Sequence, residues 1–219
     1  MFSVALASLL PGLFWLWYFN RYDVLDPEPL RKLGQCLLFG ALAVLVALAW
    51  EAPFGELLQT TNSILVQFVL SFLVVGLGEE LIKFAATYLA VVKSPEFNEP
   101  MDGIVYAIAT SIGFSVIENI LYIRAFGLVI APLRGTVATL AHIAFSGLAG
   151  YYLGKAQFSP KPKSEILRGL GLAALLHGLY DFLLITRLAS PLVLVLFILV
   201  LHYWLLTGIR QARAMSPLR

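Results

Sequence analysis

The stretch NSILVQFVLSFLVVGLGEELIKFAATYLAVV, residues 62–92, decides the fold class of this chain. It is apolar and long enough to cross a bilayer, which takes about 20 residues in a helix. Three ionisable side chains, Glu79, Glu80 and Lys83, nevertheless lie inside it. An ionisable group in hydrocarbon costs several kcal/mol, so it persists mainly where it faces a protein interior. The stretch therefore predicts a membrane-spanning helix whose polar side chains point toward other helices.

The rest of the chain is also strongly apolar. Hydrophobic residues make up 60% of the 219 residues and charged residues 13%, roughly half the charged share of a soluble domain. The mean hydropathy of +0.87 excludes a water-soluble fold of this size. Apolar runs of membrane-spanning length cover residues 3–19, 34–50, 62–92, 101–124, 133–154, 165–186 and 189–209. We expect an all-α, polytopic membrane protein with seven transmembrane helices and a single domain over residues 1–219.

The third run is longer than a bilayer requires, which predicts that its helix is tilted, protrudes or breaks near Gly76 and Gly78. The net charge of +2 is too small to indicate a nucleic-acid partner. A single cysteine, Cys36, excludes a disulfide within the chain. The lipid bilayer is thus the first partner that the sequence predicts.

The basic residues predict the orientation of the helices. With the N-terminus outside, 11 of the 15 Lys and Arg residues fall on inner segments and 3 on outer segments, while Lys83 lies inside a helix. The positive-inside rule favours the arrangement that puts more Lys and Arg on the cytoplasmic side. No basic residue precedes the first run, which is typical of an uncleaved helix and not of a signal peptide. We therefore expect the N-terminus outside and the C-terminus in the cytoplasm.

Four of the runs carry ionisable or imidazole side chains. On a helix, positions four apart share a face, so the polar residues of each run form a stripe. Counting ~1.5 Å per residue from the flanking charges places these groups between the middle of the bilayer and its outer half. The candidate site residues are Glu79, Glu80, Lys83, Glu118, His142, His177 and Asp181. They predict one polar active-site chamber inside the bundle.

Glu79 and Glu80 can supply general acid–base chemistry in such a chamber. Adjacent carboxylates cannot both ionise cheaply at low dielectric unless a cation compensates, and Lys83 is spaced to reach either of them. A carboxylate held in this way takes a proton from water and returns it to a leaving amine. We expect Glu79 to be the general base, Glu80 to share or adjust its proton, and Lys83 to balance the charge.

The histidines and the other acids indicate a metal site or an oxyanion site. Glu118, His142 and His177 match the His₂Glu ligand set of a catalytic zinc, which leaves a fourth position for water. Asp181, one turn after His177, is placed to hold the other nitrogen of that imidazole. Without a metal, both histidines can donate hydrogen bonds to an oxyanion. The HExxH spacing of soluble metalloproteases is absent, so a zinc mechanism and a metal-free glutamate mechanism both stay open.

Each of these residues also has a structural interpretation. A lone histidine in a membrane helix more often forms a hydrogen bond between helices, as we expect for His202. Glu79 and Lys83 can be a buried ion pair and no more, and Glu118 can simply pin two helices together. Four segments place such residues at a similar depth. A shared functional site explains this better than four independent structural roles do.

Several segments resemble the motifs of the PrsW family of intramembrane proteases. In the family's order they are DPEPLRKL (26–33), GEELIK (78–83), EPMDGIVYAIATSIGFSVIENILY (99–122), HIAFSGLAGYYLG (142–154) and HGLYDFLL (177–184). Together they cover most of residues 15–185. That family is related to the type II CAAX-processing proteases and, more distantly, to the APH-1 subunit of γ-secretase.

The resemblance implies a helical bundle that cuts membrane-associated proteins in a bacterial cytoplasmic membrane. Its founding activity is site-1 cleavage of a membrane-bound anti-sigma factor. The motif order assigns the catalytic pair to Glu79 and Glu80, the third acidic position to Glu118, and the two histidines to His142 and His177.

Two alternatives to this intramembrane endopeptidase are a silent APH-1-like binding subunit and a third class, either a proton-coupled carrier or a sensory seven-helix protein. In the silent subunit, the polar cluster would only hold helices together. The pattern Phe114-x-x-x-Glu118 also departs from the FxxxH pattern of the CAAX relatives. That departure argues against prenyl-protein processing.

Overall fold

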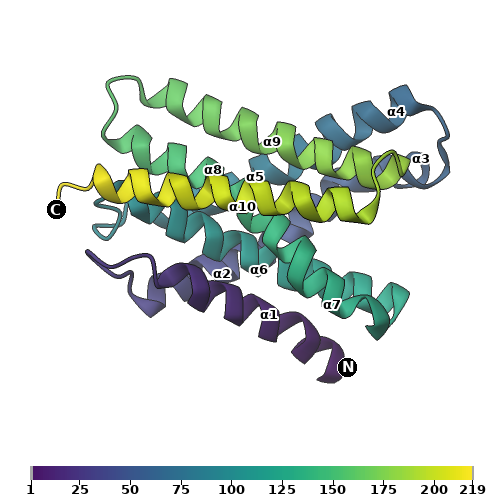
Figure 1. Cartoon of the computed structure of the whole chain (residues 1–219), viewed down its shortest axis with the longest axis horizontal. Helices are drawn as coiled ribbons and strands as arrows, with labels where there is room; N and C mark the ends of the chain where they lie inside the picture. The colour runs from purple at the N-terminus through teal and green to yellow at the C-terminus, as the bar shows by residue number, and fades with distance from the viewer. Residues whose placement is uncertain (1, 219) are drawn as a thin grey trace.

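The computed structural model describes residues 2–218, which fold into a bundle of helices (Figure 1). Seven segments are long and apolar enough to cross a membrane, and no strand occurs in the described part of the chain. The α-helices are α1 (Phe2–Asn20), α2 (Leu30–Glu51), α3 (Gly55–Thr60), α4 (Ile64–Val69), α5 (Leu77–Val91), α6 (Pro100–Phe126), α7 (Ala131–Leu133), α8 (Thr139–Gln157), α9 (Pro162–Thr186) and α10 (Pro191–Ala214). The prediction of an all-α protein with seven membrane-length helices is confirmed.

Four short segments join these helices into longer spans. They are the 3₁₀ segments η1 (Ala52–Phe54) and η3 (Leu128–Ile130) and the π-helical segments η2 (Leu70–Gly76) and η4 (Arg134–Ala138). As a result the second span runs from Leu30 to Leu58 and the fifth from Leu128 to Gln157. Both are longer than the apolar runs of the sequence, because the residues that flank each run remain helical.

A break near Gly76 and Gly78 was one of three possibilities for the third span. The span instead stays helical through both glycines. The π-helical segment η2 ends at Gly76 and α5 continues directly from it. A Cβ atom on Gly76 would lie 2.6 Å from the backbone nitrogen of Gly178 in α9. Because both positions are glycine, the two backbones touch, as in other tightly packed membrane helices. A π-helical turn is frequent at functional sites, and this one sets the start of α5 against α9.

Helices α6 and α8 form the centre of the bundle, with α2 and α1 packed on α6 and with α9 and α10 packed on α8 (Figure 1). The most apolar stretch of α6 is 78% buried, the highest value of the seven spans. A Cβ on Gly150 of α8 would lie 2.6 Å from the Cβ of Ala107 in α6. Small residues therefore allow the close approach of the two central helices.

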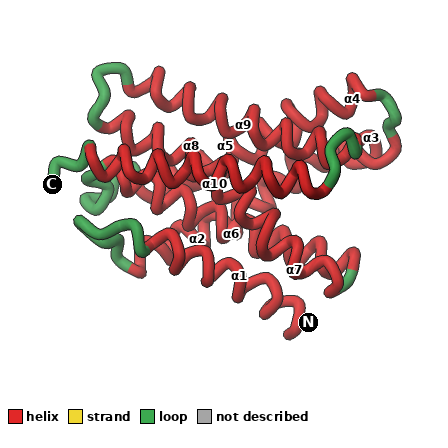
Figure 2. The backbone as a smooth tube through the Cα atoms, in the orientation of Figure 1, coloured by secondary structure: helices red, strands yellow, loops and turns green. Residues whose placement is uncertain are grey.

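The loops gather at the two ends of the bundle (Figure 2). The end that carries the C-terminus also holds the loops between α1 and α2, α5 and α6, and α8 and α9. The N-terminus lies at the opposite end. Helix starts are clearly marked in the sequence, since α6, α9 and α10 each begin at a proline, which suits the first turn of a helix.

Candidate active site

The first two turns of α5 carry the three ionisable residues of the third span. Glu79 is 5% exposed, and Glu80 and Lys83 are each 1% exposed. The Lys83 ammonium lies 2.5 Å from Glu80 Oε1 and 3.4 Å from Glu79 Oε2. Burial of a lone charge is costly, so the two acids and the lysine stabilise one another as a group. Lys83 therefore reaches both Glu79, four residues before it, and Glu80, three residues before it, as the helical spacing predicts.

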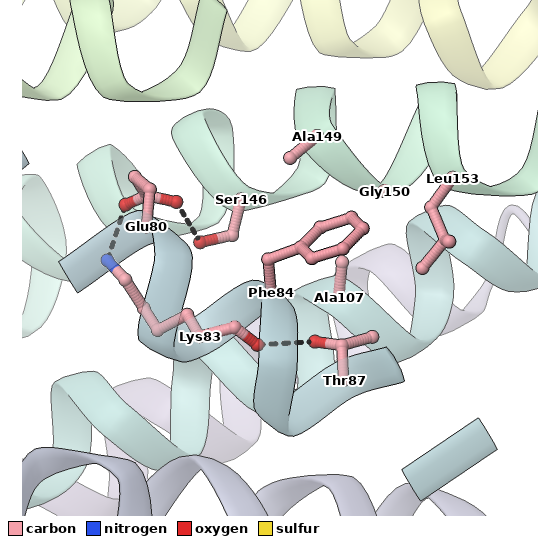
Figure 3. A pocket seen from close by; sticks show the side chains of 9 residues that line it. All are labelled: Glu80, Lys83, Phe84, Thr87, Ala107, Ser146, Ala149, Gly150 and Leu153. Atoms are coloured by element: carbon pink, nitrogen blue, oxygen red, sulfur yellow. Dashed lines mark hydrogen bonds and ion pairs between the residues drawn. The ribbon is translucent and has the colours of Figure 1, made fainter. Parts of the chain in front are cut away.

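Glu80 is fully engaged with its neighbours. Besides its contact with Lys83, its Oε1 lies 2.9 Å from His177 Nδ1. Its Oε2 accepts a hydrogen bond of 2.8 Å from the Ser146 hydroxyl of α8. Figure 3 shows the carboxylate between Lys83 and Ser146. With both oxygens bound, Glu80 is suited to orient other groups and not to take a proton from substrate water.

Glu79 has the opposite surroundings. Its Oε2 is buried and has no hydrogen-bond partner among residues 2–218. That oxygen lies 3.9 Å from His142 Nδ1 and 3.9 Å from His177 Nε2. The two imidazole rings are 5.3 Å apart and nearly perpendicular. Apart from the Lys83 ammonium at 3.4 Å, this oxygen of Glu79 therefore faces the two imidazole nitrogens, and such a buried acceptor calls for a functional explanation.

The far nitrogen of each imidazole is held by a carboxylate. His142 Nε2 lies 2.8 Å from Glu118 Oε2, and His177 Nδ1 lies 2.9 Å from Glu80 Oε1. A carboxylate on the outer nitrogen fixes the tautomer and the direction of a metal-binding histidine. The inner nitrogens lie on the side of Glu79, where His142 Nδ1 also lies 3.1 Å from the Lys83 ammonium and His177 Nε2 lies 3.2 Å from Asp181 Oδ2.

Arg134 completes the group on the side of Glu118. Its Nη2 donates to Glu118 Oε2 at 2.7 Å and its Nε donates to Asn119 Oδ1 at 2.8 Å. The guanidinium also lies over the ring of Tyr122, 4.1 Å from its centre. Arg134 lies in η4, at the start of the fifth apolar run, and no motif in the sequence marked it as a site residue.

Asp181 contacts His177, but on a different nitrogen from the one held by Glu80. Its Oδ2 lies 3.2 Å from His177 Nε2, on the side that faces Glu79. The side chain of Asp181 is 18% exposed and lines the main cavity. Asp181 is therefore placed at the wall of the cavity beside the imidazole. His202 lies elsewhere, with its Nε2 3.2 Å from the Tyr18 hydroxyl.

A cavity of ≈ 880 Å³ opens onto this group. Pockets for small ligands measure about 300–1,000 Å³, so the space admits a short stretch of polypeptide. Its polar wall consists of Glu51, Glu79, Glu118, Tyr122, Arg134, His142, His177, Tyr180 and Asp181. The rest of the lining is mostly apolar, including Leu48, Phe114, Leu121 and Phe145. The predicted polar chamber is thus present, with an apolar approach.

A second cavity, of only ≈ 10 Å³, lies beside Glu80 and Lys83 (Figure 3). Such a space holds about one water molecule. Ser146 and Thr87 are the hydroxyl residues in its lining. It is too small for a substrate, so the chemistry belongs to the larger cavity.

The structure brings all seven predicted site residues into one network of contacts and adds three residues. Ser146 binds Glu80, Arg134 binds Glu118, and Glu51 lines the cavity. Ser146 shares the helical stripe of His142, so the sequence held a signal for it. Glu51 follows directly after the second apolar run, where a charged residue normally marks the end of a membrane span.

Three of these residues are grouped as a metal site requires. One ligand atom each from Glu79, His142 and His177 lies within 4.8 Å of the others, and all three residues are buried. Two histidines and a glutamate form a common ligand set of catalytic zinc. The Glu79 oxygen without a hydrogen bond among residues 2–218 and the outer carboxylates of both histidines fit such an ion. Glu118, which the sequence suggested as the third ligand, contacts the outer nitrogen of His142.

Membrane-length helices around a buried Glu-His-His group and a cavity are the arrangement expected of an intramembrane hydrolase. The family model described as PrsW family intramembrane metalloprotease matches residues 28–207. The chain belongs to this family. The family prediction is confirmed, and with it the class of activity, so the protein is an intramembrane endopeptidase that acts on a protein substrate in a membrane.

Curated relatives agree with this assignment over nearly the whole chain. Protease PrsW of Geobacillus kaustophilus (strain HTA426) is 35% identical over 215 residues, which cover 97% of this chain and 93% of that protein. Protease PrsW of Bacillus subtilis (strain 168) is 34% identical, with 97% and 95% covered. Protease PrsW of Clostridioides difficile (strain 630) is 30% identical, with 93% and 87% covered. No solved structure gives a significant match.

Proposed function

We propose that Glu79, His142 and His177 hold a zinc ion and that peptide bonds are hydrolysed at the wall of the main cavity. The observation that carries this proposal is the arrangement of the two imidazoles. Each has its outer nitrogen on a carboxylate and its inner nitrogen 3.9 Å from the same Glu79 oxygen, which also lies 3.4 Å from the Lys83 ammonium. Zinc when bound would polarise the scissile carbonyl and activate water.

The other residues of the site have separate tasks in this proposal. Glu80 and Glu118 orient the two imidazoles, and Arg134 balances the charge of Glu118. Lys83 balances the charge of Glu80. Asp181 lies in the cavity wall. Among residues 2–218, His177 is the only Lys, Arg or His residue with a side-chain nitrogen within 4.0 Å of its carboxylate. It is placed to accept a proton from water and to deliver it to the leaving amine.

A metal-free mechanism is the second candidate, and Lys83 favours it. Its ammonium lies 3.1 Å from His142 Nδ1 and 3.4 Å from Glu79 Oε2, so it already places a positive charge at this centre. In that mechanism Glu79 takes the proton of water and the two imidazoles stabilise the oxyanion. Both mechanisms need Glu79 and both histidines, and only the first needs a bound metal.

The substrate that fits the family resemblance is a membrane-bound anti-sigma factor cut at site 1. The apolar wall of the cavity supports a substrate segment that is itself apolar. Such a segment leaves the lipid favourably only where its side chains pack closely against the cavity wall. We propose a bacterial cytoplasmic membrane with the N-terminus outside. In this orientation the loops rich in Lys and Arg share the end of the bundle that carries the C-terminus (Figure 2).

Metal content and cleavage measured on the same variants test the proposal. The purified chain should contain about one zinc per molecule. Glu79→Gln, His142→Ala and His177→Ala should each lose the metal and the cleavage of a reconstituted substrate. Glu56→Gln, which changes an exposed acid on α3, should keep both. An active preparation without any metal would leave only the glutamate mechanism, and cleavage at the wild-type rate by Glu79→Gln would overturn both.

A further inference from the structure

Asn119 is a fully buried amide of α6 that has no task in the proposed ligand set. Its side chain is 0% exposed, and it follows Glu118 in the chain. Its Oδ1 accepts a hydrogen bond of 2.8 Å from Arg134 Nε. Its Nδ2 donates to Thr139 Oγ1 at 3.0 Å and to the main-chain carbonyl of Arg134 at 3.5 Å. Asn119 therefore holds Arg134 by both its side chain and its main chain.

The partners of Asn119 fix the direction of its amide. A guanidinium only donates and a carbonyl only accepts, so Oδ1 has to face Arg134 Nε and Nδ2 has to face the Arg134 carbonyl. The hydroxyl of Thr139 donates to the same carbonyl at 3.1 Å. A buried amide is tolerated where its polar atoms are paired in this way. Among side chains of this size, only asparagine offers an acceptor and a donor side by side.

Three residues of α6 hold the Arg134 guanidinium. Nη2 donates to Glu118 Oε2 at 2.7 Å, and the centre of the Tyr122 ring lies 4.1 Å from the guanidinium carbon. Asn119 is the third, through Nε. The ring covers one face of the planar group, and the two hydrogen bonds fix its rotation in the plane. Because a free arginine side chain samples many rotamers, these contacts restrict Arg134 to one position.

The Glu118 oxygen that receives Arg134 also contacts His142. Oε2 of Glu118 lies 2.7 Å from Arg134 Nη2 and 2.8 Å from His142 Nε2. The inner nitrogen of the same imidazole, Nδ1, lies 3.9 Å from Glu79 Oε2. A shift of the guanidinium would therefore move the carboxylate that holds the imidazole, and with it the nitrogen that faces Glu79. The path from Asn119 to the centre consists of direct contacts at every step.

We propose that Asn119 is a positioning residue that fixes the Arg134 guanidinium and thereby keeps Glu118 on the outer nitrogen of His142. The inference rests on the proposed function, in which His142 is a metal ligand. Loss of a group that holds a metal-binding histidine typically weakens metal binding 10- to 100-fold. Asn119 acts one contact further out, so its loss should weaken zinc binding by about 10-fold, the lower end of that range.

Zinc affinity of the full-length chain in detergent, measured by competition with a chromophoric chelator, tests this role. Asn119→Leu nearly keeps the size of the side chain but removes the acceptor for Arg134, and it should weaken zinc binding about 10-fold. Thr139→Val is the matched control. It removes a partner of Nδ2 and leaves the contact between Oδ1 and Arg134, so zinc affinity should stay within about threefold of wild type.

A double-mutant cycle tests whether Asn119 acts through Arg134. In Arg134→Met there is no guanidinium left to hold. Adding Asn119→Leu to that variant should change zinc affinity by less than about twofold, because the two substitutions remove the same chain of contacts. Losses that multiply in the double variant would contradict the proposal. If Asn119→Leu does not fold, Asn119→Ser, whose hydroxyl is too short to reach Arg134, takes its place in both measurements.

The outcomes separate this inference from the proposed function. Wild-type zinc affinity in His142→Ala would overturn the proposed ligand set and the inference with it. Loss of zinc in His142→Ala together with wild-type zinc affinity in Asn119→Leu would overturn the inference alone. Equal weakening by Asn119→Leu and Thr139→Val would assign Asn119 to the packing of α6 against η4, which also contradicts the proposal.

Discussion

At the scale of single residues, the division of labour between Asp181 and the ligand set can be measured directly. Asp181 lies 3.2 Å from His177 Nε2 and lines the cavity, and we propose that it handles the proton of the reacting water. Asp181→Asn should therefore lower kcat by about 10²- to 10⁴-fold, because an amide cannot accept that proton. Zinc content, measured by elemental analysis, should stay at the wild-type level. Loss of zinc in this variant would instead assign Asp181 to orienting His177, and an unchanged kcat would remove it from the mechanism.

At the scale of the elements, the contact between η2 and α9 is what brings α5 against His177. A Cβ on Gly178 would lie 2.7 Å from the Cα of Phe72, too close without a backbone shift. Overpacking of this kind costs about 1–3 kcal/mol. Since each kcal/mol moves Tm by about 2–4 °C in a chain of this size, Gly178→Ala should lower both Tm and cleavage. Gly171→Ala is the matched control in the same helix, because a Cβ there has nothing within 4 Å. Equal Tm values for the two variants would show that this contact does not limit stability.

At the scale of the whole molecule, a second buried acidic cluster ties the α1–α2 loop to the start of α6. Burial, reinforced by nearby carboxylates, raises the pKa of Asp23 from 3.8 to about 7 and that of Glu28 from 4.5 to about 9. Glu28 accepts a hydrogen bond from Tyr106 of α6, and the Asp102 carboxyl lies close to it. The folded protein thus holds these protons more tightly than the unfolded chain does. The stability they contribute is full below pH about 4 and is lost as the pH rises through about 7 and then about 9.

This sign gives a prediction for the full chain in detergent. The Tm should fall as the pH rises from 5 to 9, and Glu28→Gln should flatten the fall between pH 7 and 9, since an amide has no proton to lose there. Thermal unfolding followed by circular dichroism at several pH values measures both slopes. A Glu28→Gln protein with the same slope as wild type would contradict the assignment to Glu28.

Much of the molecule follows from the chain itself. Apolar runs of sufficient length predict the seven helices, because only a helix satisfies its own backbone hydrogen bonds in lipid. The cost of ionisable groups in hydrocarbon is enough to single out Glu79, His142 and His177 from their positions in the sequence. The orientation of the termini stays a prediction, because it is defined relative to a membrane. The single domain over residues 1–219 stays a prediction as well. The metal, too, stays a proposal.

Only the tertiary structure decides how these groups are paired. Helical spacing predicts which side chains share a face of one helix. It does not predict which side chains of a neighbouring helix they contact. It is the packing of α8 against α6 and α9 that sets Glu118 and Glu80 on the outer nitrogens and leaves Glu79 between the inner ones. Arg134 and Glu51 enter the site in the same way, because contacts between helices depend on close packing across long stretches of chain, which local sequence does not encode.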